Sequence, residues 1–394
     1  MQHANRTTLP EPDAISASHS ERVMRFIAER IEEGGGSISF AEYMHHALYA
    51  PGLGYYVAGA KKFGAEGDFI TAPEVSPVFG RILARQCAEV LDDMGGGSIL
   101  EYGAGSGKLA ADILTALQER DALPERYAIL EVSADLQERQ AEFLHGALPQ
   151  LASRIAWLDR PPVNHRGVIV ANEVMDALPV ERFRKTEDGI EQFRVTLRDG
   201  ALAMMQAQAP QRLVERVESI EEALGEALPV GYTSELSPGL DDWIASLADS
   251  LDDGVAFLFD YGVTRREYFA RDRADGWLRC YFRHHVHHDP LQLPGIQDLT
   301  AWVDFSAVAE AALNSGLEVA GYTAQAQFLI AGGLDAEMQD FASLPVSRQL
   351  QLSGQVKTLT LPAEMGEHFK CMALRRGESG TPSAFSLADR THTL

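Results

Sequence analysis

The chain is poor in cysteine and has no long apolar run. Its 394 residues include three scattered cysteines and no CxxC pair, which argues against a disulfide framework and a cysteine metal motif and predicts a reducing compartment. Wholly apolar runs such as 168–171 and 255–259 are far shorter than the roughly 18 residues of a membrane-spanning helix. The sequence therefore predicts no membrane insertion.

Positive charge is also scarce. Lys and Arg total 34 against 57 Asp and Glu, a formal net charge of −23. This balance argues against a nucleic-acid partner, because such binding depends on cations that neutralise phosphates. It suits a cationic partner, such as a basic peptide segment, although an acidic surface that keeps the protein soluble is the simpler explanation. Residues 1–20 lack the apolar core of a signal peptide and contain a single Arg, so we expect a cytoplasmic location.

The apolar pattern predicts an α/β protein with an N-terminal helical segment. The first helix is expected over 20–33, ending at three glycines, and the second begins at the capping box Ser39-x-x-Glu42. A third helix begins at Ser76-Pro77. Beyond residue 97, short and continuous apolar runs alternate with helical stretches, which is typical of a mostly parallel sheet covered by helices on both faces.

These patterns divide the chain into six predicted parts. Flexible tails are expected at both ends, a helical lid precedes the sheet-forming core, and two additions interrupt the core. The addition within the core is expected to hold an antiparallel ribbon and a charged helix. The predicted bounds are 1–19 for the first tail, 20–96 for the lid, 97–262 for the core with its insertion at 180–232, 263–315 for a cap, 316–376 for the end of the core sheet and 377–394 for the second tail.

The strongest local motif is a glycine-rich turn between a strand and a helix. Gly103 permits the tight turn, Gly105 lets a ligand approach the backbone, and Gly107 lets the helix and strand pack closely. The GxGxG spacing differs from the GxGxxG of dinucleotide-binding folds, which argues against a nicotinamide oxidoreductase. With Glu101 two positions before the first glycine, the motif resembles motif I of class I S-adenosylmethionine-dependent methyltransferases.

Acidic residues follow the next two predicted strands. Glu131 ends the strand after the glycine motif, where a carboxylate can accept two hydrogen bonds from the cis-diol of a ribose. Asp159 ends the following strand and is a weaker candidate for the adenine edge, since this strand end is equally explained by simple packing.

Three polar residues, Asn172, Glu173 and Asp176, follow the fourth strand of the predicted sheet. Ligands bind at this carboxyl edge in parallel α/β sheets. Their oxygens suit a cationic guanidinium held by charge-assisted hydrogen bonds. The alternative is that the Asn-Glu pair caps a helix. We expect these three residues to face the substrate.

Longer segments resemble the MidA family of methyltransferases over roughly residues 40–375. The segments that carry the resemblance are 54–56, 67–76, 79–80, 101–107, 172–173, 176–178 with Pro179, 234–238, 260–262, 295–300, 303–305, 364–366 and 369–370. The resemblance implies a class I methyltransferase fold with an N-terminal helical segment and inserted cap elements. It also implies S-adenosyl-L-methionine as the cofactor. The mitochondrial member of the family methylates arginine in a complex I subunit, and the resemblance leaves the substrate of bacterial members open.

By matching position, the family's loop at 71–76 is expected to close over the cofactor beside the glycine turn. The cofactor-binding residues that we expect are Thr71, Pro73, Glu74, Ser76, Glu101, Tyr102, Gly103, Ala104, Gly105, Gly107, Glu131, Asp159 and Asn172, and the catalytic ones are Asn172, Glu173 and Asp176. No metal site is expected, because the histidines of 284–288 have no thiol partner nearby.

The sequence thus predicts a bacterial, cytoplasmic S-adenosylmethionine-dependent methyltransferase. Its expected acceptor is a protein side chain, arginine by resemblance, in a basic segment of a partner for which a respiratory complex I subunit is one candidate. The alternatives are a small-molecule N- or O-methyltransferase and a non-catalytic scaffold that binds the cofactor. A homodimer is one option for the assembly.

Overall fold

The computed structural model describes residues 9–58 and 70–394. The first eight residues and part of the 67–76 segment therefore lie outside the description. Among the described residues, no helix has the length and apolar character needed to span a bilayer.

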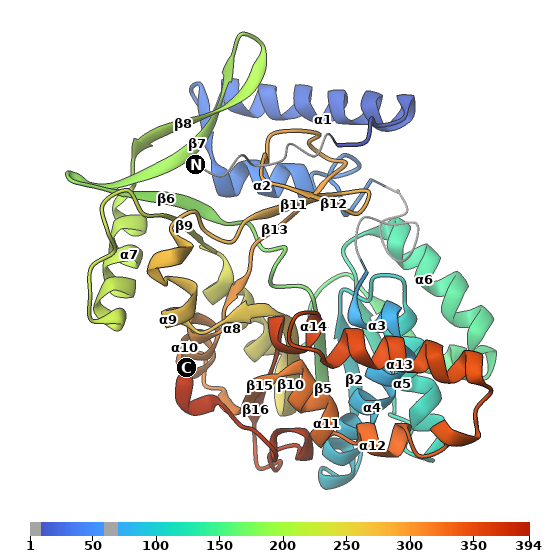
Figure 1. The fold of residues 1–394 in the computed structure, drawn as a ribbon. Helices are drawn as coiled ribbons and strands as arrows, with labels where there is room; N and C mark the ends of the chain where they lie inside the picture. The colour runs from blue at the N-terminus through green and yellow to red at the C-terminus, as the bar shows by residue number, and fades with distance from the viewer. Residues whose placement is uncertain (1–8, 59–69) are drawn as a thin grey trace.

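A sheet of eight strands forms the centre of the molecule (Figure 1). Its main path runs β15-β16-β10-β5-β2-β3-β4, and all neighbours from β10 to β4 are parallel. Strand β16 is antiparallel to both of its neighbours. The bounds are β2 Ser98–Tyr102, β3 Tyr127–Leu130, β4 Ile155–Leu158, β5 His165–Asn172, β10 Leu251–Val263, β15 Glu318–Ala324 and β16 Phe369–Arg376. The predicted α/β fold with a mostly parallel sheet is confirmed.

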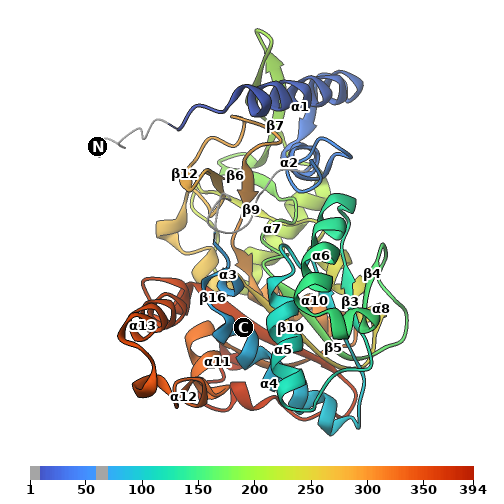
Figure 2. The ribbon, with the colours of Figure 1, turned by 90° about the vertical axis from the view of Figure 1, so that its right-hand side faces the viewer.

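The continuous apolar runs arise because both faces of the sheet are covered. Along β5, Val168 and Val170 enter one hydrophobic cluster, whereas Ile169 and Ala171 enter the cluster on the opposite face. The first cluster contains residues of α4 Pro77–Asp93 and α5 Lys108–Glu119, which lie side by side in Figure 2. The second contains α8 Leu240–Ser250 and α10 Phe305–Asn314. Successive side chains of such a strand therefore point to opposite faces of the sheet, and the helices on each face bury them.

Side-chain caps begin the early helices. Ser39 and Glu42 form the predicted capping box of α2 Phe40–Tyr49, and Ser76 caps α4. Helix α1, Ala14–Glu33, begins six residues before the predicted start, because the side chain of Asp13 accepts hydrogen bonds from the first-turn N–H groups. Residues 14–19, expected in a flexible tail, are therefore helical.

A second layer lies over the carboxyl edge of the central sheet, at the top of Figure 1. It contains a sheet of β1 Ser37–Ser39, β6 Glu181–Thr186, β7 Gly189–Arg198, β8 Ala201–Gln208 and β9 Thr233–Leu236, and a smaller one of β11 Arg279–Phe282, β12 His285–His287 and β13 Asp298–Thr300. Strand β1 pairs with β7, so the lid and the insertion share one sheet. Residues of α1, α2, β7, β11 and β13 also share one hydrophobic cluster. We call this the outer layer.

The predicted ribbon and charged helix of the insertion are present. Strands β6 and β7 pair in antiparallel fashion, and α7 spans Gln211–Leu224. The eighth strand of the central sheet is β14 Val303–Asp304. The remaining helices are α3 Ala72–Val75, α6 Ala134–Ala147, η1 Pro149–Arg154, α9 Arg265–Tyr268, η2 Arg271–Arg273, α11 Gln325–Ala331, α12 Leu334–Glu337, η3 Phe341–Ser343, α13 Val346–Thr360, α14 Met365–His368, η4 Ser383–Phe385 and η5 Thr391–Thr393.

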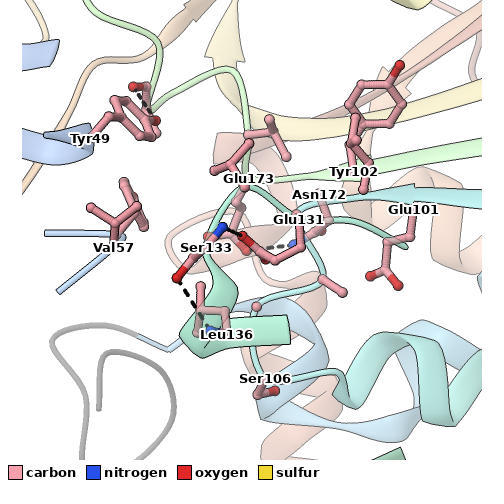
Figure 3. Close-up of a pocket in the computed structure, with 18 of the residues that line it drawn as sticks. Tyr49, Val57, Glu101, Tyr102, Ser106, Glu131, Ser133, Leu136, Asn172 and Glu173 are labelled. Atoms are coloured by element: carbon pink, nitrogen blue, oxygen red, sulfur yellow. Dashed lines mark hydrogen bonds between the residues drawn. The ribbon is translucent and has the colours of Figure 1, made fainter. Parts of the chain in front are cut away.

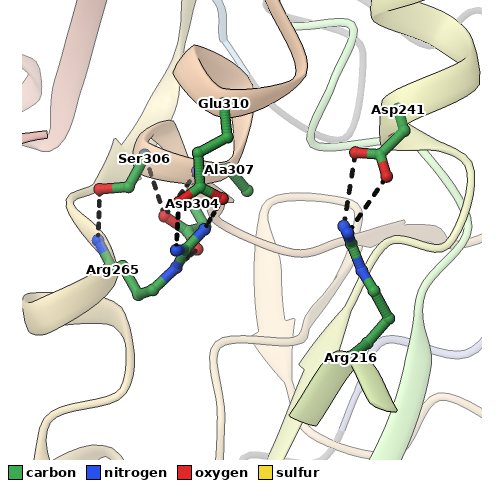
Figure 4. Close-up of polar contacts among 7 residues, drawn as sticks. All are labelled: Arg216, Asp241, Arg265, Asp304, Ser306, Ala307 and Glu310. Carbon is green, nitrogen blue, oxygen red and sulfur yellow. Dashed lines mark hydrogen bonds and ion pairs between the residues drawn. The ribbon is translucent and has the colours of Figure 1, made fainter. Parts of the chain in front are cut away.

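The last part of the predicted cap belongs to the core. Strand β14 extends β10 in parallel, and α10 packs in the core cluster. Figure 4 shows how this return is held: Arg265 contacts Asp304 at 3.2 Å and pairs with Glu310 through both terminal nitrogens. A second pair, Arg216 and Asp241, joins α7 to α8. The boundary expected at residue 315 therefore lies near residue 302.

The segment 377–394, predicted to be a flexible tail, packs against the core instead. Ala384 and Phe385 are 1% and 2% exposed, and the Phe385 ring lies 5.7 Å from that of Phe328. Farther along, the Arg390 N–H donates to the carbonyl of Tyr322. The polar composition concealed this docking, because few apolar side chains, Ala384, Phe385 and Leu394 among them, carry it.

Replacing Phe385 with Ala is expected to lower the free energy of unfolding by about 3–5 kcal/mol, since it leaves a cavity in the core. Leu387→Ala, at a side chain that is 58% exposed, is the control and should cost less than about 0.5 kcal/mol. Denaturant unfolding measures both values. Equal, small losses would mean that the C-terminal segment does not pack.

Candidate active site

A cavity of about 770 Å³ opens at the carboxyl edge of the central sheet. Figure 3 shows Glu131, Asn172 and Glu173 close together there, at the ends of their strands. Of the residues predicted to bind cofactor or substrate, those that line the cavity are Thr71, Pro73, Glu74, Glu101, Tyr102, Gly103, Ala104, Gly105, Glu131, Asp159, Asn172, Glu173 and Asp176. Segments more than one hundred residues apart thus meet in one space.

The glycine turn has the backbone that only glycine adopts easily. Gly103, Gly105 and Gly107 have φ values of 64°, 54° and 83°. The first two line the cavity, whereas Gly107 begins α5 outside it. A Cβ at Gly107 would lie 3.3 Å from the ring of Phe143 in α6. The predicted close packing at Gly107 is therefore against a neighbouring helix rather than the strand.

The segment after residue 70 lies against this turn. Thr71, Pro73 and Glu74 line the cavity, and the Ser106 hydroxyl donates a hydrogen bond to Glu74 Oε1. Ser76 does not line it. Its Oγ accepts from the Val78 N–H and donates to Gln355, so this predicted cofactor ligand is a helix cap. The Ser-Pro pair signalled that role.

Glu131 is held by a network that the sequence did not reveal. Its two carboxylate oxygens accept from the Ser133 N–H and from Gln140 Nε2, both at 3.0 Å. Gln140 also donates to the Gly105 carbonyl and accepts from the Trp157 indole. Gln140 therefore joins three strand ends at the cavity wall. Its amphipathic helix gave no signal of this contact.

The other predicted residues of this half lie at its rim and floor. Asp159 is exposed at the rim, and the Tyr102 hydroxyl lies 3.4 Å from Ser250 Oγ. Asn172 donates to Glu173 through Nδ2, whereas its buried Oδ1 has no hydrogen-bond partner among the described residues. That oxygen is therefore a buried acceptor without a partner, on a residue that lines the cavity.

Glu101 is buried beneath the glycine turn. It is 2% exposed and accepts a hydrogen bond of 2.7 Å from the Tyr127 hydroxyl. Burial raises the pKa of Glu101 to about 7, and the nearby Glu131 charge adds to the rise. Glu101 can therefore gain or lose a proton near neutral pH.

Glu173 occupies a strained position at the end of β5. Its φ of 55° is unusual for a residue with a side chain. One carboxylate oxygen accepts from Asn172, and the other accepts from the Tyr261 hydroxyl at 2.9 Å. Burial raises the pKa of Glu173 to about 8, with a further contribution from the charge of Asp176.

Asp176 is the second carboxylate of this loop. Its Oδ2 accepts from the Thr300 hydroxyl at 2.7 Å, and its buried Oδ1 has no partner among the described residues. Burial raises the pKa of Asp176 to about 6. Fully buried Asp260 lies beneath the loop and accepts from the N–H groups of Met175 and Asp176.

The sequence also missed the opposite wall, which comes from α2 and the loop after it. Tyr49 and Tyr56 line the cavity with stacked rings, their centroids 5.5 Å apart. Tyr56 lies within a segment that carries the family resemblance. Nothing in the neighbouring sequence indicates that it lines the cavity, because its hydrogen-bond partner, Asp298, comes from the cap.

The chemistry of this lining fits S-adenosylmethionine. Among the described lining residues there is no Lys or Arg, whereas there are several carboxylates. The cofactor combines a sulfonium and an ammonium cation with a ribose diol, and the vacant Asn172 Oδ1 and the carboxylate of Glu131 are suitable acceptors. Within the described ranges, no three His, Cys, Asp or Glu side chains are grouped to hold a metal ion.

Comparison with known proteins agrees with this chemistry. The sequence model of a family described as S-adenosyl-L-methionine-dependent methyltransferases matches residues 82–323, more than half of the chain. The crystal structure of a Burkholderia thailandensis protein bound to S-adenosyl-homocysteine has a TM-score of 0.92 at 40% identity, covering 98% of this chain and 100% of that one.

Curated relatives extend over nearly the same length. The zebrafish (Danio rerio) protein arginine methyltransferase NDUFAF7, mitochondrial, is 31% identical over 90% of this chain and 87% of its own. The Drosophila melanogaster homologue is also 31% identical, over 87% of this chain and 82% of its own.

The sheet order, its single reversed strand and the cavity at the carboxyl edge define a class I methyltransferase fold. The chain belongs to the MidA family of S-adenosyl-L-methionine-dependent methyltransferases.

The buried Glu101 should make the ligand-free protein less stable as pH rises from about 4.5 to about 7. Over this range the unfolded chain releases the proton that the folded protein retains, so the folded state binds more protons and loses stability with rising pH. Glu101→Gln stays neutral. Relative to wild type, it should gain up to about 3 kcal/mol between pH 4 and pH 8.

Unfolding by denaturant across this pH range measures the gain. Glu138→Gln, at an exposed position on α6, is the control and should show no such trend. A stability difference between Glu101→Gln and wild type that is constant with pH would contradict the assignment.

Proposed function

We propose that this methyltransferase transfers methyl groups to arginine side chains in a basic segment of a partner protein. The observation that carries the proposal is the pair of buried carboxylates, Glu173 and Asp176, in a cavity whose described lining has no Lys or Arg. The net charge of −23 and the names of the NDUFAF7 relatives support the same acceptor.

The glycine-turn half of the cavity would hold the cofactor. The backbone of Gly103 and Gly105 permits close approach, Glu131 accepts the ribose hydroxyls, and Asn172 Oδ1 accepts from the ammonium group. S-adenosylmethionine supplies a methyl group on a positively charged sulfur. Because that reagent is already reactive, the protein contributes by aligning the two partners and excluding water.

The loop after β5 that carries Glu173 and Asp176, which we call the carboxylate loop, would receive the acceptor. A guanidinium is cationic and a poor nucleophile, so its proton must leave as the new N–C bond forms. Asp176, the lower of the two in pKa, holds the cation by charge-assisted hydrogen bonds. The arriving cation lowers the pKa of Glu173, which then ionises and accepts the proton released during transfer.

The acceptor class is tested by incubating the full chain with methyl-labelled S-adenosylmethionine and extract of cells that lack the protein. Acid hydrolysis followed by amino-acid chromatography identifies the labelled residue. Methylarginine in protein is the expected result. Label found only in small molecules would instead indicate a small-molecule methyltransferase. Binding of S-adenosylmethionine without any labelled product would favour a non-catalytic scaffold that binds the cofactor.

Glu131→Gln is expected to weaken binding of S-adenosyl-homocysteine by about 10–100-fold, because a charged hydrogen-bond acceptor is worth roughly 1.5–3 kcal/mol. Calorimetric titration measures the change. The control is Glu142→Gln, at an exposed position on α6, the helix that also carries Gln140. Unchanged affinity in Glu131→Gln would remove Glu131 from the cofactor site.

Glu173→Gln is expected to lower kcat by about 10²–10⁴-fold while cofactor affinity is retained, since the proton acceptor is lost. In wild type, kcat/KM should rise with pH as Asp176 and then Glu173 ionise, near pH 6 and pH 8; the variant should keep only the lower step. Glu235→Gln, a buried carboxyl group of β9 that does not line the cavity, is the matched control. A full transfer rate in Glu173→Gln would exclude this role.

A further inference from the structure

The cavity wall that contacts the loop after β5 is built from two tyrosines with fixed rings. Tyr49 and Tyr56 stack with an interplanar angle of 22°. The Tyr49 hydroxyl donates to the Ala177 carbonyl, and the Tyr56 hydroxyl donates to Asp298 Oδ1, both at 2.9 Å. Because each hydroxyl is engaged, the rings present fixed surfaces to the cavity, as Tyr49 does in Figure 3.

A close backbone contact brings Tyr56 to this position. After α2 the chain folds back, and the N–H groups of Tyr55 and Tyr56 donate to the carbonyls of Ala47 and Leu48. A Cβ at Gly54 would lie 2.5 Å from the Leu48 backbone, so no larger residue fits there. Gly54 therefore permits the close turn that brings Tyr56 onto the ring of Tyr49.

Strand β13 connects this wall to the carboxylate loop. Asp298 and Thr300 are two residues apart, so their side chains lie on the same side of the strand. Asp298 accepts from Tyr56, and Thr300 donates to Asp176 Oδ2. The N–H of Ala301 also donates to the Asp176 carbonyl. The lid, the cap and the core thus meet at one strand.

This arrangement buries Oδ1 of Asp176, a residue whose charge lies close enough to Tyr49 and Tyr56 to contribute to raising the pKa of both. Asp176 is 5% exposed and lines the cavity, and Oδ1 has no hydrogen-bond partner among the described residues. Burying a carboxylate oxygen without a hydrogen-bond partner is unfavourable, because the oxygen loses its contact with water and gains none in return. A cationic donor that entered the cavity would remove this penalty.

We propose that Tyr49, Tyr56 and Asp176 form a slot for the planar cationic head of the acceptor, with Asp298 and Thr300 as positioning residues. The inference deepens the proposed function and rests on it for the identity of the substrate. A guanidinium is flat and weakly hydrated, so it stacks on an aromatic ring while its in-plane N–H groups donate to a carboxylate. An ammonium is compact and strongly hydrated, and it gains less from the same wall.

The slot is tested by binding, independently of methyl transfer. Ligand-observed NMR measures the affinity of N-ethylguanidinium for the full chain saturated with S-adenosyl-homocysteine. N-ethylurea, a neutral molecule of similar shape, and ethylammonium, a cation that is not planar, are the comparison probes. N-ethylguanidinium should bind at least tenfold more tightly than either. Equal affinities of the three probes, or no binding of N-ethylguanidinium, would overturn the proposal.

Three variants locate the binding. Asp176→Asn, Tyr56→Leu and Thr300→Val should each weaken N-ethylguanidinium binding at least fivefold and leave the affinity for S-adenosyl-homocysteine unchanged. Thr300→Ser, which keeps the hydroxyl donor, should restore wild-type binding and so separates positioning from a general loss of structure. The variants come from three different segments, so one that folds poorly leaves the other two to decide.

Matched controls remove hydroxyl groups elsewhere. Tyr322→Phe deletes a buried hydroxyl that has no hydrogen-bond partner among the described residues, and Thr323→Val deletes one that donates to the Ala388 carbonyl at 2.7 Å. Both lie on β15, away from the cavity, and should bind N-ethylguanidinium as wild type does. Equal losses in the controls and the slot variants would overturn the assignment.

The slot and the proposed function fail in distinguishable ways. Methylarginine formed equally well by wild type and by Tyr56→Leu would keep the function and reject the slot. Tight N-ethylguanidinium binding that depends on Asp176, with no methylarginine in any protein, would keep the slot and reject the function.

Discussion

The candidate site depends on one buried carboxylate that has no cationic partner in the part of the chain that the structure describes. Asp260 accepts hydrogen bonds from the backbone N–H groups of Met175, Asp176 and Tyr261. These bonds fix the loop that follows β5 against the end of β10, and so fix where Glu173 and Asp176 stand. Burial and the two neighbouring carboxylates raise the pKa of Asp260 well above its ordinary value. The site therefore gathers carboxyl groups that tend to stay protonated before any ligand arrives, and a cation that enters would favour their ionised forms.

The two halves of the cavity have different structural origins. The cofactor half is built by consecutive β-strands and the turns that follow them, so its residues are fixed by the central sheet. The tyrosine half comes from the outer layer, where β1 pairs with β7 and α2 packs against both. An inserted ribbon more than 130 residues beyond α2 thus holds the helix that carries Tyr49.

Local patterns were sufficient for the fold class and for placing most of the predicted cofactor residues around one cavity. Glu101 lies near the end of β2, the GxGxG turn follows that strand, and Glu131 follows β3, so their meeting at one sheet edge was predictable. Tyr49, Tyr56 and Thr300 were not predictable as a group, because hydrogen bonds between distant segments bring them together.

The errors have physical causes of the same kind. Ser76 was assigned to the cofactor although the Ser-Pro pair already signalled a helix cap. The C-terminal segment looked flexible because its Ser, Thr and Gly content outweighs the few apolar side chains, such as Phe385 and Leu394, that dock it. The composition of a segment is an average over all its residues, whereas its packing against the core depends on a few side chains.

The register of β13 has a consequence for how the acceptor half opens. Asp298 and Thr300 lie on one rigid strand, yet they hold residues from opposite walls. A shift of that strand would release Tyr56 and Asp176 in the same movement. In the proposed slot, the aromatic and the acidic contacts to an acceptor would therefore depend on the position of the same short strand.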